Sequence, residues 1–599
     1  MPPNPPRPAP QAAARPHEGR LLRRLLLPAL IGLVAGLAAL AFLLCLEWAS
    51  WFCLGLLAGA PMPLPAGERL VSMPVDAPYR PWLLCLLPAL GGLISGLLVY
   101  RLAPEAAGGG IDPMIDAFHN QAGIIRKRVP YVKGLATVCL LATGGSAGRE
   151  GPIAQIGAGF GSWLARVLGL STRERRIFLL AGCAAGIGAI FRAPLGAAIT
   201  SIEILYREDY ESEAIIPCVI SSVIAYSLFT YFFGFAPIFA LPRFTFSDPR
   251  ELAVYAALAL VCWPAAALYQ KTFFRTRDFF AGLALPLPLR PMLGGLAVGA
   301  LALAVPQVLG AGWGWVEMAV RGELGLGLLL LAAGAKIAAT SLSVGSGGSG
   351  GLFGPTIFIG GMLGGAVGLI GQVLWPEVVR EPGGYVLVGM AAYCAAVIKN
   401  PLGAMFMVAE MSQSHGLLPP LMLVSVVAML LGRGPGLFVR QVRNKFASPA
   451  HQDDLTVDVL SEMTVGQVFK ARPDFITLAA DLRFKDLRRA IADSRQYVFP
   501  VLDAAGGLAG LLSLKNVRNV LFEDSLADLV VVGELATAPV SLDPDQDLNS
   551  ALVAFLESGH NQIPVVEPGG GQPRILGMLS HEDVIAAYHA EISRRTQAE

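Results

Sequence analysis

Residues 144–152 read GGSAGREGP and set an arginine and a glutamate side by side between two apolar segments, 131–143 and 153–170. A charged side chain at the centre of a bilayer costs about 2.5–3.5 kcal/mol even on a lenient insertion scale, so a pair at that depth points to a function. Four glycines around the pair let the backbone bend and approach a ligand closely. Pro152 favours the start of a helix there, and a helix N-terminus binds anions. The carboxylate of Glu150 is the first anion that could occupy it.

The composition places the chain in a lipid bilayer. Of its 599 residues 54% are hydrophobic and only 15% are charged, against about 25% charged residues in soluble proteins. The net charge of +1 gives no support for a nucleic-acid partner. The eight cysteines form no CxxC pair, so neither a zinc site nor a disulfide framework is indicated. The sequence also lacks HExxH, a nucleophile elbow and a P-loop, and we expect no enzymatic activity.

Apolar segments recur from residue 25 to residue 432, and several are shorter than the roughly 20 residues of a perpendicular span. Short segments interrupted by Gly and Pro are typical of broken helices that end inside the membrane. Because open strands are excluded there, the predicted class is an all-α polytopic membrane protein. The first apolar segment, 25–57, is too long for a signal peptide and is predicted to be a retained helix. The basic residues before it predict a cytoplasmic N-terminus, and the Pro/Ala-rich stretch 1–19 should be disordered.

The membrane part contains an internal repeat. Residues 189–203, AIFRAPLGAAITSIE, align without gaps with residues 396–410, AVIKNPLGAMFMVAE. At nearly the same offset GREGP (148–152) matches GLFGP (351–355). Membrane repeats are commonly inverted, with the substrate site between them. We therefore expect Pro152 and Pro355 to open two half-helices that converge on one anion from opposite leaflets.

The composition changes after the last apolar segment, and no later segment could span a membrane. Two similar α+β units follow: TVGQV (464–468), VFPVLD (498–503) and GLLSLKNV (510–517) in the first, QIPVVE (562–567) and GMLSHEDV (577–584) in the second. Each has too little core to fold alone, so the two should pair. The predicted division is a membrane domain over 20–446, a linker over 447–460, and units over 461–520 and 521–591.

These motifs together resemble the CLC family of chloride channels and proton-coupled chloride transporters, followed by a pair of CBS domains. In that resemblance Glu150 takes the position of the gating glutamate, which blocks the outer anion site and moves away when it is protonated or displaced. The backbone N–H groups of Arg149 and Gly151 would face that anion. Those of Leu352 and Phe353 would bind the central anion.

Three positions depart from the family pattern. Gly109, followed by Gly110, replaces the serine whose hydroxyl coordinates the central anion, and a neutral hydrogen bond is worth about 0.5–1.5 kcal/mol. His415 falls at the position of the tyrosine that closes the same site from the cytoplasmic side. Ile204 falls where proton-coupled members carry an inner glutamate. The adjacent Glu203 is either a residue of a proton path or a structural carboxylate bonded to backbone, and the matching Glu410 favours the structural role.

The resemblance implies a homodimer that conducts chloride without a required cofactor. Because an isoleucine cannot carry a proton, the sequence favours a voltage-gated chloride channel, passive and gated by Glu150; a Cl⁻/H⁺ exchanger of the same fold is the alternative. A membrane enzyme or cation transporter is a third candidate, but a cation path would need rings of carboxylates. In the CBS pair, Ser513, Asn516, Ser580 and Asp583 resemble the element that holds a ribose, so an adenine nucleotide is a candidate ligand. We expect a multi-pass protein of a bacterial-type inner or plasma membrane, with both termini cytoplasmic.

Overall fold

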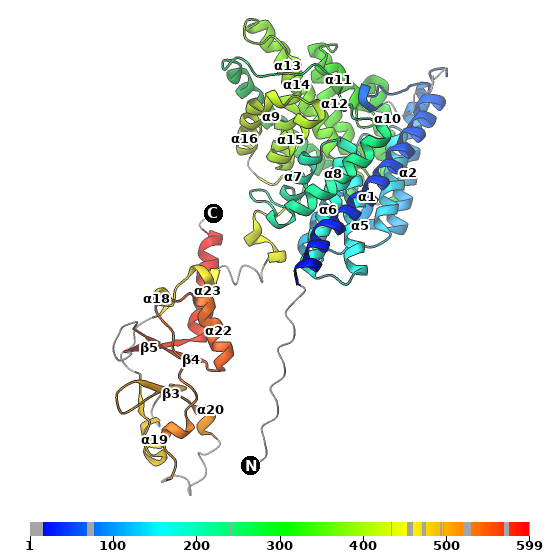
Figure 1. The fold of residues 1–599 in the computed structure, drawn as a ribbon. Coiled ribbons are helices and arrows are strands. Elements are labelled where there is room, and N and C mark those ends of the chain that lie inside the picture. Colours follow the sequence, from blue (N-terminus) through cyan, green and yellow to red (C-terminus); the bar gives the residue numbers. More distant parts are fainter. Residues whose placement is uncertain are drawn as a thin grey trace. The chain divides into compact units, whose positions relative to one another are not determined.

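The computed structural model shows two compact units, Met1–Ala450 and His451–Glu599. The first is built from helices, and the second contains short strands as well (Figure 1). The structure describes residues 16–68, 77–239, 241–432, 434–451, 459–469, 475–491, 494, 496–518, 529–567 and 574–597. Most of the predicted disordered stretch 1–19 lies outside these residues, and the first helix already begins at Pro16.

Long apolar helices make up the first unit. Within its described residues the α-helices are α1 (Pro16–Ser50), α2 (Pro81–Leu102), α3 (Ile111–Asn120), α4 (Val129–Ala142), α5 (Glu150–Val167), α6 (Thr172–Phe191), α7 (Pro194–Glu203), α8 (Ile215–Phe233), α9 (Glu251–Gly282), α10 (Arg290–Ala304), α11 (Trp313–Val320), α12 (Leu326–Gly345), α13 (Phe353–Leu374), α14 (Gly383–Ile398), α15 (Pro401–Ser412) and α16 (Leu418–Leu431). A π-helical segment, Trp51–Leu57, extends α1, so the predicted first span 25–57 is continuous.

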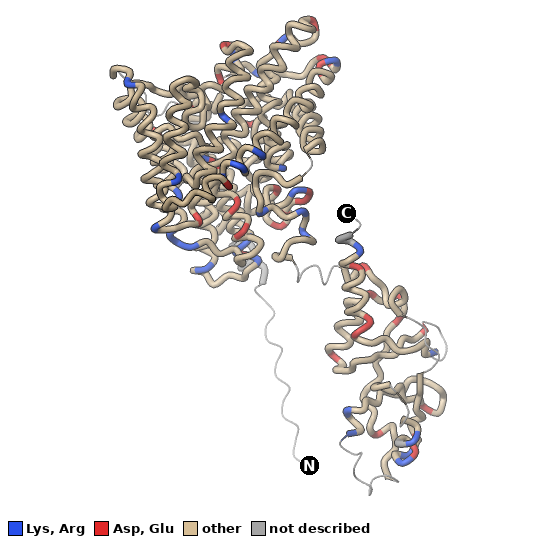
Figure 2. The backbone as a smooth tube through the Cα atoms, turned by 180° about the vertical axis from the view of Figure 1, so that it is seen from behind, with Lys and Arg blue, Asp and Glu red and all other residues tan. Residues whose placement is uncertain are grey.

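The lengths of these helices confirm a membrane protein with broken helices. Seven helical segments in the described part are long and apolar enough to cross a bilayer. Others are too short to cross perpendicularly: α4 has 14 residues and α14 has 16, where about 20 are needed. Figure 2 shows few charged positions in the middle of this unit and more toward the end where the chain leaves it. The predicted all-α class is confirmed.

The two repeats have the same local structure. Helices α6 and α14 both end on a non-glycine residue with left-handed backbone, Arg192 (φ 52°) and Lys399 (φ 58°). Each is followed by a helix with proline at its first position, Pro194 in α7 and Pro401 in α15. The matched sequence segments therefore form matched helix–turn–helix structures.

The repeats run in opposite directions. The amide Nε2 of Gln441, just before the second unit, donates to Ile204 O at 2.9 Å and to Ile398 O at 3.0 Å. Helix α7 thus ends, and α15 begins, beside the segment 441–450. We call this side of the first unit the linker end and the opposite side the far end. This antiparallel arrangement agrees with the predicted inverted repeat.

Short strands and helices form the second unit. The strands β1 (Leu478–Ala479), β2 (Val498–Leu502) and β3 (Leu508–Ser513) lie in the order β1-β2-β3, with β1 parallel and β3 antiparallel to β2. The strands β4 (Gln562–Val566) and β5 (Ile575–Ser580) form an antiparallel pair. The helices of this unit include α18 (Val465–Val468), α19 (Phe484–Ile491), α20 (Leu514–Val517), α21 (Val532–Leu535), α22 (Leu548–Ser558) and α23 (His581–Gln597).

The two halves of the second unit exchange their opening segments. Val465 packs into the core of the second half, with Phe555 and Ile563. Val532 packs into the core of the first half, with Leu478. The two halves therefore depend on each other for a complete core, as the predicted pairing requires. The predicted boundaries, 461–520 and 521–591, follow sequence order, so they place Val465 and Val532 each in the half whose core it does not join.

Candidate anion site

Two glycine loops meet at the centre of the first unit. Gly148 N donates to Gly351 O at 2.7 Å, and Gly351 N donates to Gly148 O at 2.6 Å. Helix α5 begins two residues after the first glycine and α13 two residues after the second. Both helices therefore start at one point, so their positive dipole ends and free first-turn N–H groups converge there.

The two helices leave this point in opposite directions. Helix α5 is followed by α6, which ends at the far end, so α5 runs toward the linker end. Helix α13 is followed by α14, which ends at the linker end, so α13 runs toward the far end. Pro152 and Pro355 stand third in their helices and not first. A proline is tolerated throughout a first turn because the N–H groups there have no partner within the helix.

The carboxylate of Glu150 lies on the N-terminus of the opposite helix. Its Oε2 accepts a hydrogen bond from Gly354 N, in the first turn of α13, at 3.1 Å. The side chain is 2% exposed. A Cβ on Gly148 would overlap Oε2, and a Cβ on Gly354 would lie 2.8 Å from Oε1. Glycine at these two positions makes the room that the carboxylate occupies.

A second glycine contact brings the loop before α3 to the same place. A Cβ on Gly151 would overlap Gly109 O, and a Cβ on Gly110 would lie 2.7 Å from Gly151 O. Gly110 has φ 85°, a conformation that favours glycine. A Cβ on Gly109 would lie 3.6 Å from the Leu352 side chain. The structure therefore brings Gly109, Gly110, Gly151 and Leu352 together around the starts of α5 and α13.

Phe353 and Arg149 also flank this point, in different ways. Phe353 is the first residue of α13, and its ring packs edge-on against Phe191 at 5.6 Å between centroids. The guanidinium of Arg149 forms a buried ion pair with Glu68. Its charge therefore has a partner of its own, and what Arg149 offers to an anion is its backbone N–H, as the resemblance implies. Glu68 was not predicted, because nothing in the sequence links this residue of a short 3₁₀ turn, Ala66–Glu68, to an arginine 81 positions later.

Two buried lysines hold the loops of the two repeats. Lys133 Nζ donates to Ala106 O at 3.1 Å and to Gly108 O at 2.6 Å. Lys336 Nζ donates to Val308 O at 3.0 Å and to Gly310 O at 2.7 Å. Both side chains are fully buried. The sequence analysis did not predict this role. The two lysines stand 203 residues apart, which is also the offset between the two glycine loops. That shared offset could have indicated that both lysines do the same work in their repeats.

Ile204 and Glu203 lie at the linker end of α7. Ile204 is 1% exposed and packs in the main core. Glu203 accepts hydrogen bonds from Leu402 N at 3.1 Å and from Gly403 N at 2.7 Å, in the first turn of α15. These are the contacts of a structural carboxylate. A role for Glu203 in a proton path stays a prediction.

His415 does not join the predicted site. It begins a short helical turn after α15, its side chain is exposed, and it lies at the far end. The prediction had put it beside the central anion, and its exposed position beyond the end of α15 does not bring it to the glycine loops. The cause is local: Gln413 ends α15 with φ 52°, so an alignment extended without gaps from Glu410 leaves the helix and the site.

The four predicted nucleotide-binding residues cap two helices of the second unit. Ser513 Oγ accepts from Asn516 N at 3.3 Å at the start of α20. Ser580 Oγ donates to Asp583 Oδ2 at 2.5 Å and accepts from Asp583 N at 3.1 Å at the start of α23. These contacts explain the Ser-x-x-Asn and Ser-x-x-Asp patterns as N-caps. Nucleotide binding stays a prediction.

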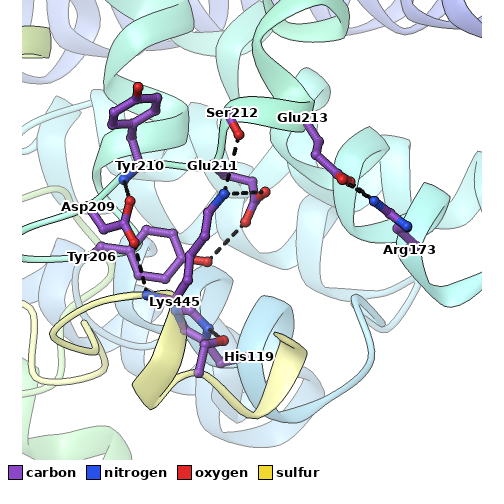
Figure 3. Close-up of polar contacts among 10 residues, drawn as sticks. His119, Arg173, Tyr206, Asp209, Tyr210, Glu211, Ser212, Glu213 and Lys445 are labelled. Atoms are coloured by element: carbon purple, nitrogen blue, oxygen red, sulfur yellow. Dashed lines mark hydrogen bonds and ion pairs between the residues drawn. The ribbon is translucent and has the colours of Figure 1, made fainter. Parts of the chain in front are cut away.

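A polar cluster fastens the segment that leads out of the first unit (Figure 3). Lys445 N donates to Asp209 Oδ2 at 3.0 Å, and its Nζ lies 3.5 Å from Glu211 Oε1. Tyr206 OH donates to Glu211 Oε2 at 2.9 Å, and His119 Nδ1 lies 2.7 Å from Ser448 Oγ. The loop after α7 and the helix α3, which follows the Gly109 loop, are thus both bonded to residues 445–448.

Known proteins share this arrangement. Residues 91–433 match the family model described as voltage gated chloride channel, and residues 532–590 match that of the CBS domain. A ClcB-like chloride channel protein of Ralstonia nicotianae is 33% identical over 411 residues, which cover 68% of this chain and 93% of the relative. The H(+)/Cl(-) exchange transporter ClcA of Salmonella arizonae is 30% identical over 442 residues, covering 71% and 90%.

Solved structures share the fold. A slow cyanobacterial Cl-/H+ antiporter superposes with a TM-score of 0.61 at 23% identity, over 69% of this chain and 96% of that one. A eukaryotic CLC transporter superposes with a TM-score of 0.57 at 19% identity, over 94% and 98%. With its paired glycine loops, its inverted repeat and the match over residues 91–433, the chain belongs to the CLC family of membrane proteins and carries a C-terminal CBS domain.

Proposed function

We propose that this protein transports chloride across a membrane in exchange for protons, with Glu150 as both the gate and the proton carrier. One observation carries the proposal: the carboxylate of Glu150 accepts a hydrogen bond from Gly354 N at the start of α13. A negatively charged side chain there occupies the place that a helix N-terminus offers to a free anion.

The exchange follows from competition for these backbone donors. A chloride ion and the ionised carboxylate of Glu150 carry the same charge and seek the same N–H groups, so they exclude each other. Protonation removes the charge of the carboxylate and its preference for the helix end, which frees the place for chloride. Binding by backbone dipoles without a fixed cation keeps the anion weakly held and able to leave. Exchange results if the displaced carboxylate takes up its proton from the side toward which chloride leaves and releases it on the side from which chloride came.

The ClcA relatives support exchange ahead of passive conduction, although the Ralstonia relative is a chloride channel protein by name. The Salmonella protein, 30% identical, is an H(+)/Cl(-) exchange transporter by name. This reverses the order suggested by the sequence, in which Ile204 favoured a channel. Ile204 is still the observation behind the second candidate, a passive chloride channel, because an aliphatic side chain buried in the core cannot relay a proton. Assembly as a homodimer with both termini in the cytoplasm is part of the proposal.

A flux measurement distinguishes the two candidates. The full chain is reconstituted in liposomes, and a chloride gradient is applied while external pH is recorded. We expect the chloride gradient to drive protons uphill at a fixed ratio of protons to chloride. Chloride flux without proton movement would replace the exchanger by the channel. Flux that follows a potassium gradient and ignores chloride would reject anion transport altogether.

A further inference from the structure

A groove of about 670 Å³ opens on the side of the first unit, between α1, α4 and α5. Small residues create it: Ala35 and Ala38 on α1 face Gly134 on α4 and Gly159 on α5. A Cβ on Gly159 would overlap the ring of Pro130, so glycine lets α5 approach the start of α4. A Cβ on Gly134 would meet Ile156 at an ordinary contact distance of 3.5 Å, so this position has room for a side chain.

The walls of the groove are apolar. Val138, Ile156 and Phe160 lie along it, and all three side chains are half-buried. The neighbouring Tyr131 and Leu135 are 76% and 61% exposed on the same helix. In a membrane protein such a surface faces lipid. If the groove were empty, its lining would lose dispersion contacts, and water in it would find no hydrogen-bond partners along the apolar walls. A hydrocarbon chain is therefore the occupant that fits the apolar lining.

One mouth of the groove is cationic. Lys127 lines it, and Arg128 is the next residue along the chain; both side chains are exposed. Neither has an ion-pair partner among the residues that the structure describes, whereas the adjacent Arg126 pairs with Glu105. Trp163 also lines the groove, and tryptophan favours the level of lipid head groups. Basic residues at the end of a membrane helix attract anionic lipids.

We propose that this groove binds an anionic phospholipid, with one acyl chain along α4 and α5 and its phosphate at Lys127 and Arg128. The wall formed by Ile156, Phe160 and Trp163 belongs to α5, whose first residue is Glu150. The bound lipid therefore packs against the helix that holds the gate and supports its position opposite α13. This effect on transport rests on the proposed function, whereas the lipid site itself does not.

Lipid binding is tested on the full chain in detergent by native mass spectrometry, with phosphatidylglycerol and phosphatidylcholine as probes. Wild-type protein should retain phosphatidylglycerol more tightly than phosphatidylcholine. Lys127→Gln with Arg128→Gln should lower phosphatidylglycerol affinity by about fivefold per cation removed. Gly134→Leu, whose side chain fills the groove, should lower the affinity for both lipids. The matched control is Lys271→Gln, a change of an exposed lysine on α9, which should leave binding unchanged.

The outcomes separate the parts of the proposal. Equal binding of the two lipids by wild type would overturn the head-group assignment, and unchanged binding by Gly134→Leu would overturn the acyl-chain site. The two surface substitutions keep the test valid if Gly134→Leu fails to fold. Chloride flux is then compared in vesicles with and without phosphatidylglycerol. Wild-type flux that ignores the lipid would overturn the supporting role alone, whereas absence of wild-type flux from both kinds of vesicle would count against the proposed transport function.

Discussion

Glu203 and Glu410 each cap the helix that carries the other. Glu203, the last residue of α7, accepts from Leu402 N and Gly403 N at the start of α15. Glu410, near the end of α15, accepts from Leu195 N at 3.2 Å and Gly196 N at 2.8 Å at the start of α7. A carboxylate at a helix N-terminus satisfies free N–H groups and complements the helix dipole. Since α7 and α15 are antiparallel, the two glutamates join both ends of the pair and relate the two repeats.

Replacing either glutamate should destabilise the membrane unit to a similar extent. Glu203→Gln and Glu410→Gln each keep an acceptor oxygen but lose the charge, and hydrogen bonds to charged groups contribute about 1.5–3 kcal/mol. We expect each variant to lower the unfolding temperature of the purified full chain in detergent, with a comparable shift for both.

A role for Glu203 in proton transfer would give a different pattern. In that case Glu203→Gln would lower the ratio of protons to chloride transported, while Glu410→Gln would not. Equal ratios in both variants, together with equal losses of stability, support two structural caps. A fall in the ratio for Glu203→Gln at unchanged stability would contradict the capping role.

Neutralising the gate should separate chloride movement from proton movement. Glu150→Gln cannot ionise and has no negative charge to compete with chloride at the start of α13. We expect chloride flux to continue, proton coupling to disappear and the dependence of flux on pH to flatten. Stopped-flow chloride efflux with simultaneous pH recording in liposomes measures all three. Unchanged pH dependence in Glu150→Gln would remove Glu150 from its proposed role in either candidate function.

The buried lysine of the first repeat should control anion affinity. Lys133→Met removes one of the two donors to each of the carbonyls of Ala106 and Gly108, which also accept from Ser349 Oγ and Gly350 N. A hydrogen bond to a charged group contributes about 1.5–3 kcal/mol. The loop that carries Gly109 should loosen, so we expect weaker chloride binding by isothermal titration calorimetry and a lower unfolding temperature. Lys336→Met is the comparison, because Lys336 holds the loop before α11. It should lower stability but affect chloride affinity less; equal losses of affinity would contradict a special role for the Gly109 loop.

The sequence was sufficient to predict the features that repeat. The match between GREGP and GLFGP placed both helix starts and Glu150 correctly, because each motif depends on glycines that permit a specific backbone approach. The structural role of Glu203 could be anticipated from its match to Glu410. The partner of Arg149 could not, since Glu68 lies in a short 3₁₀ turn that only the tertiary fold brings to α5. His415 was misplaced because an alignment carries no information on where a helix turns away from a site.

Residues 445–448 offer a test of how firmly the segment before the second unit is held. Glu211 accepts from Tyr206 OH and pairs with Lys445, so Glu211→Ala removes two contacts of the cluster in Figure 3. We expect faster amide hydrogen exchange over residues 445–450. Glu213→Ala is the matched control: Glu213 belongs to the same loop but pairs with the exposed Arg173. Equal exchange in both variants would show that the cluster does not fasten this segment.

The second unit should lose stability in acid through His560. This side chain is 8% exposed, and burial lowers its pKa below the usual value of about 6.5. Thr537 Oγ1 donates to Leu511 O at 3.0 Å, so it accepts from His560 Nε2 at 2.9 Å, and the neutral imidazole satisfies this contact. Because the folded protein binds the proton less readily than the unfolded chain, stability is fully present above about pH 6.5 and falls as pH drops through the lowered pKa.

Hydrogen exchange of β4 in the full chain, recorded between about pH 8 and pH 5 and corrected for the intrinsic rate, measures this loss. Protection should decrease below about pH 6.5 in the wild type. In His560→Gln, which keeps a donor and cannot be protonated in this range, protection should change less with pH. An acid dependence that is the same in His560→Gln would assign the loss to other groups. A wild type without acid dependence would show that the burial of His560 does not oppose its protonation.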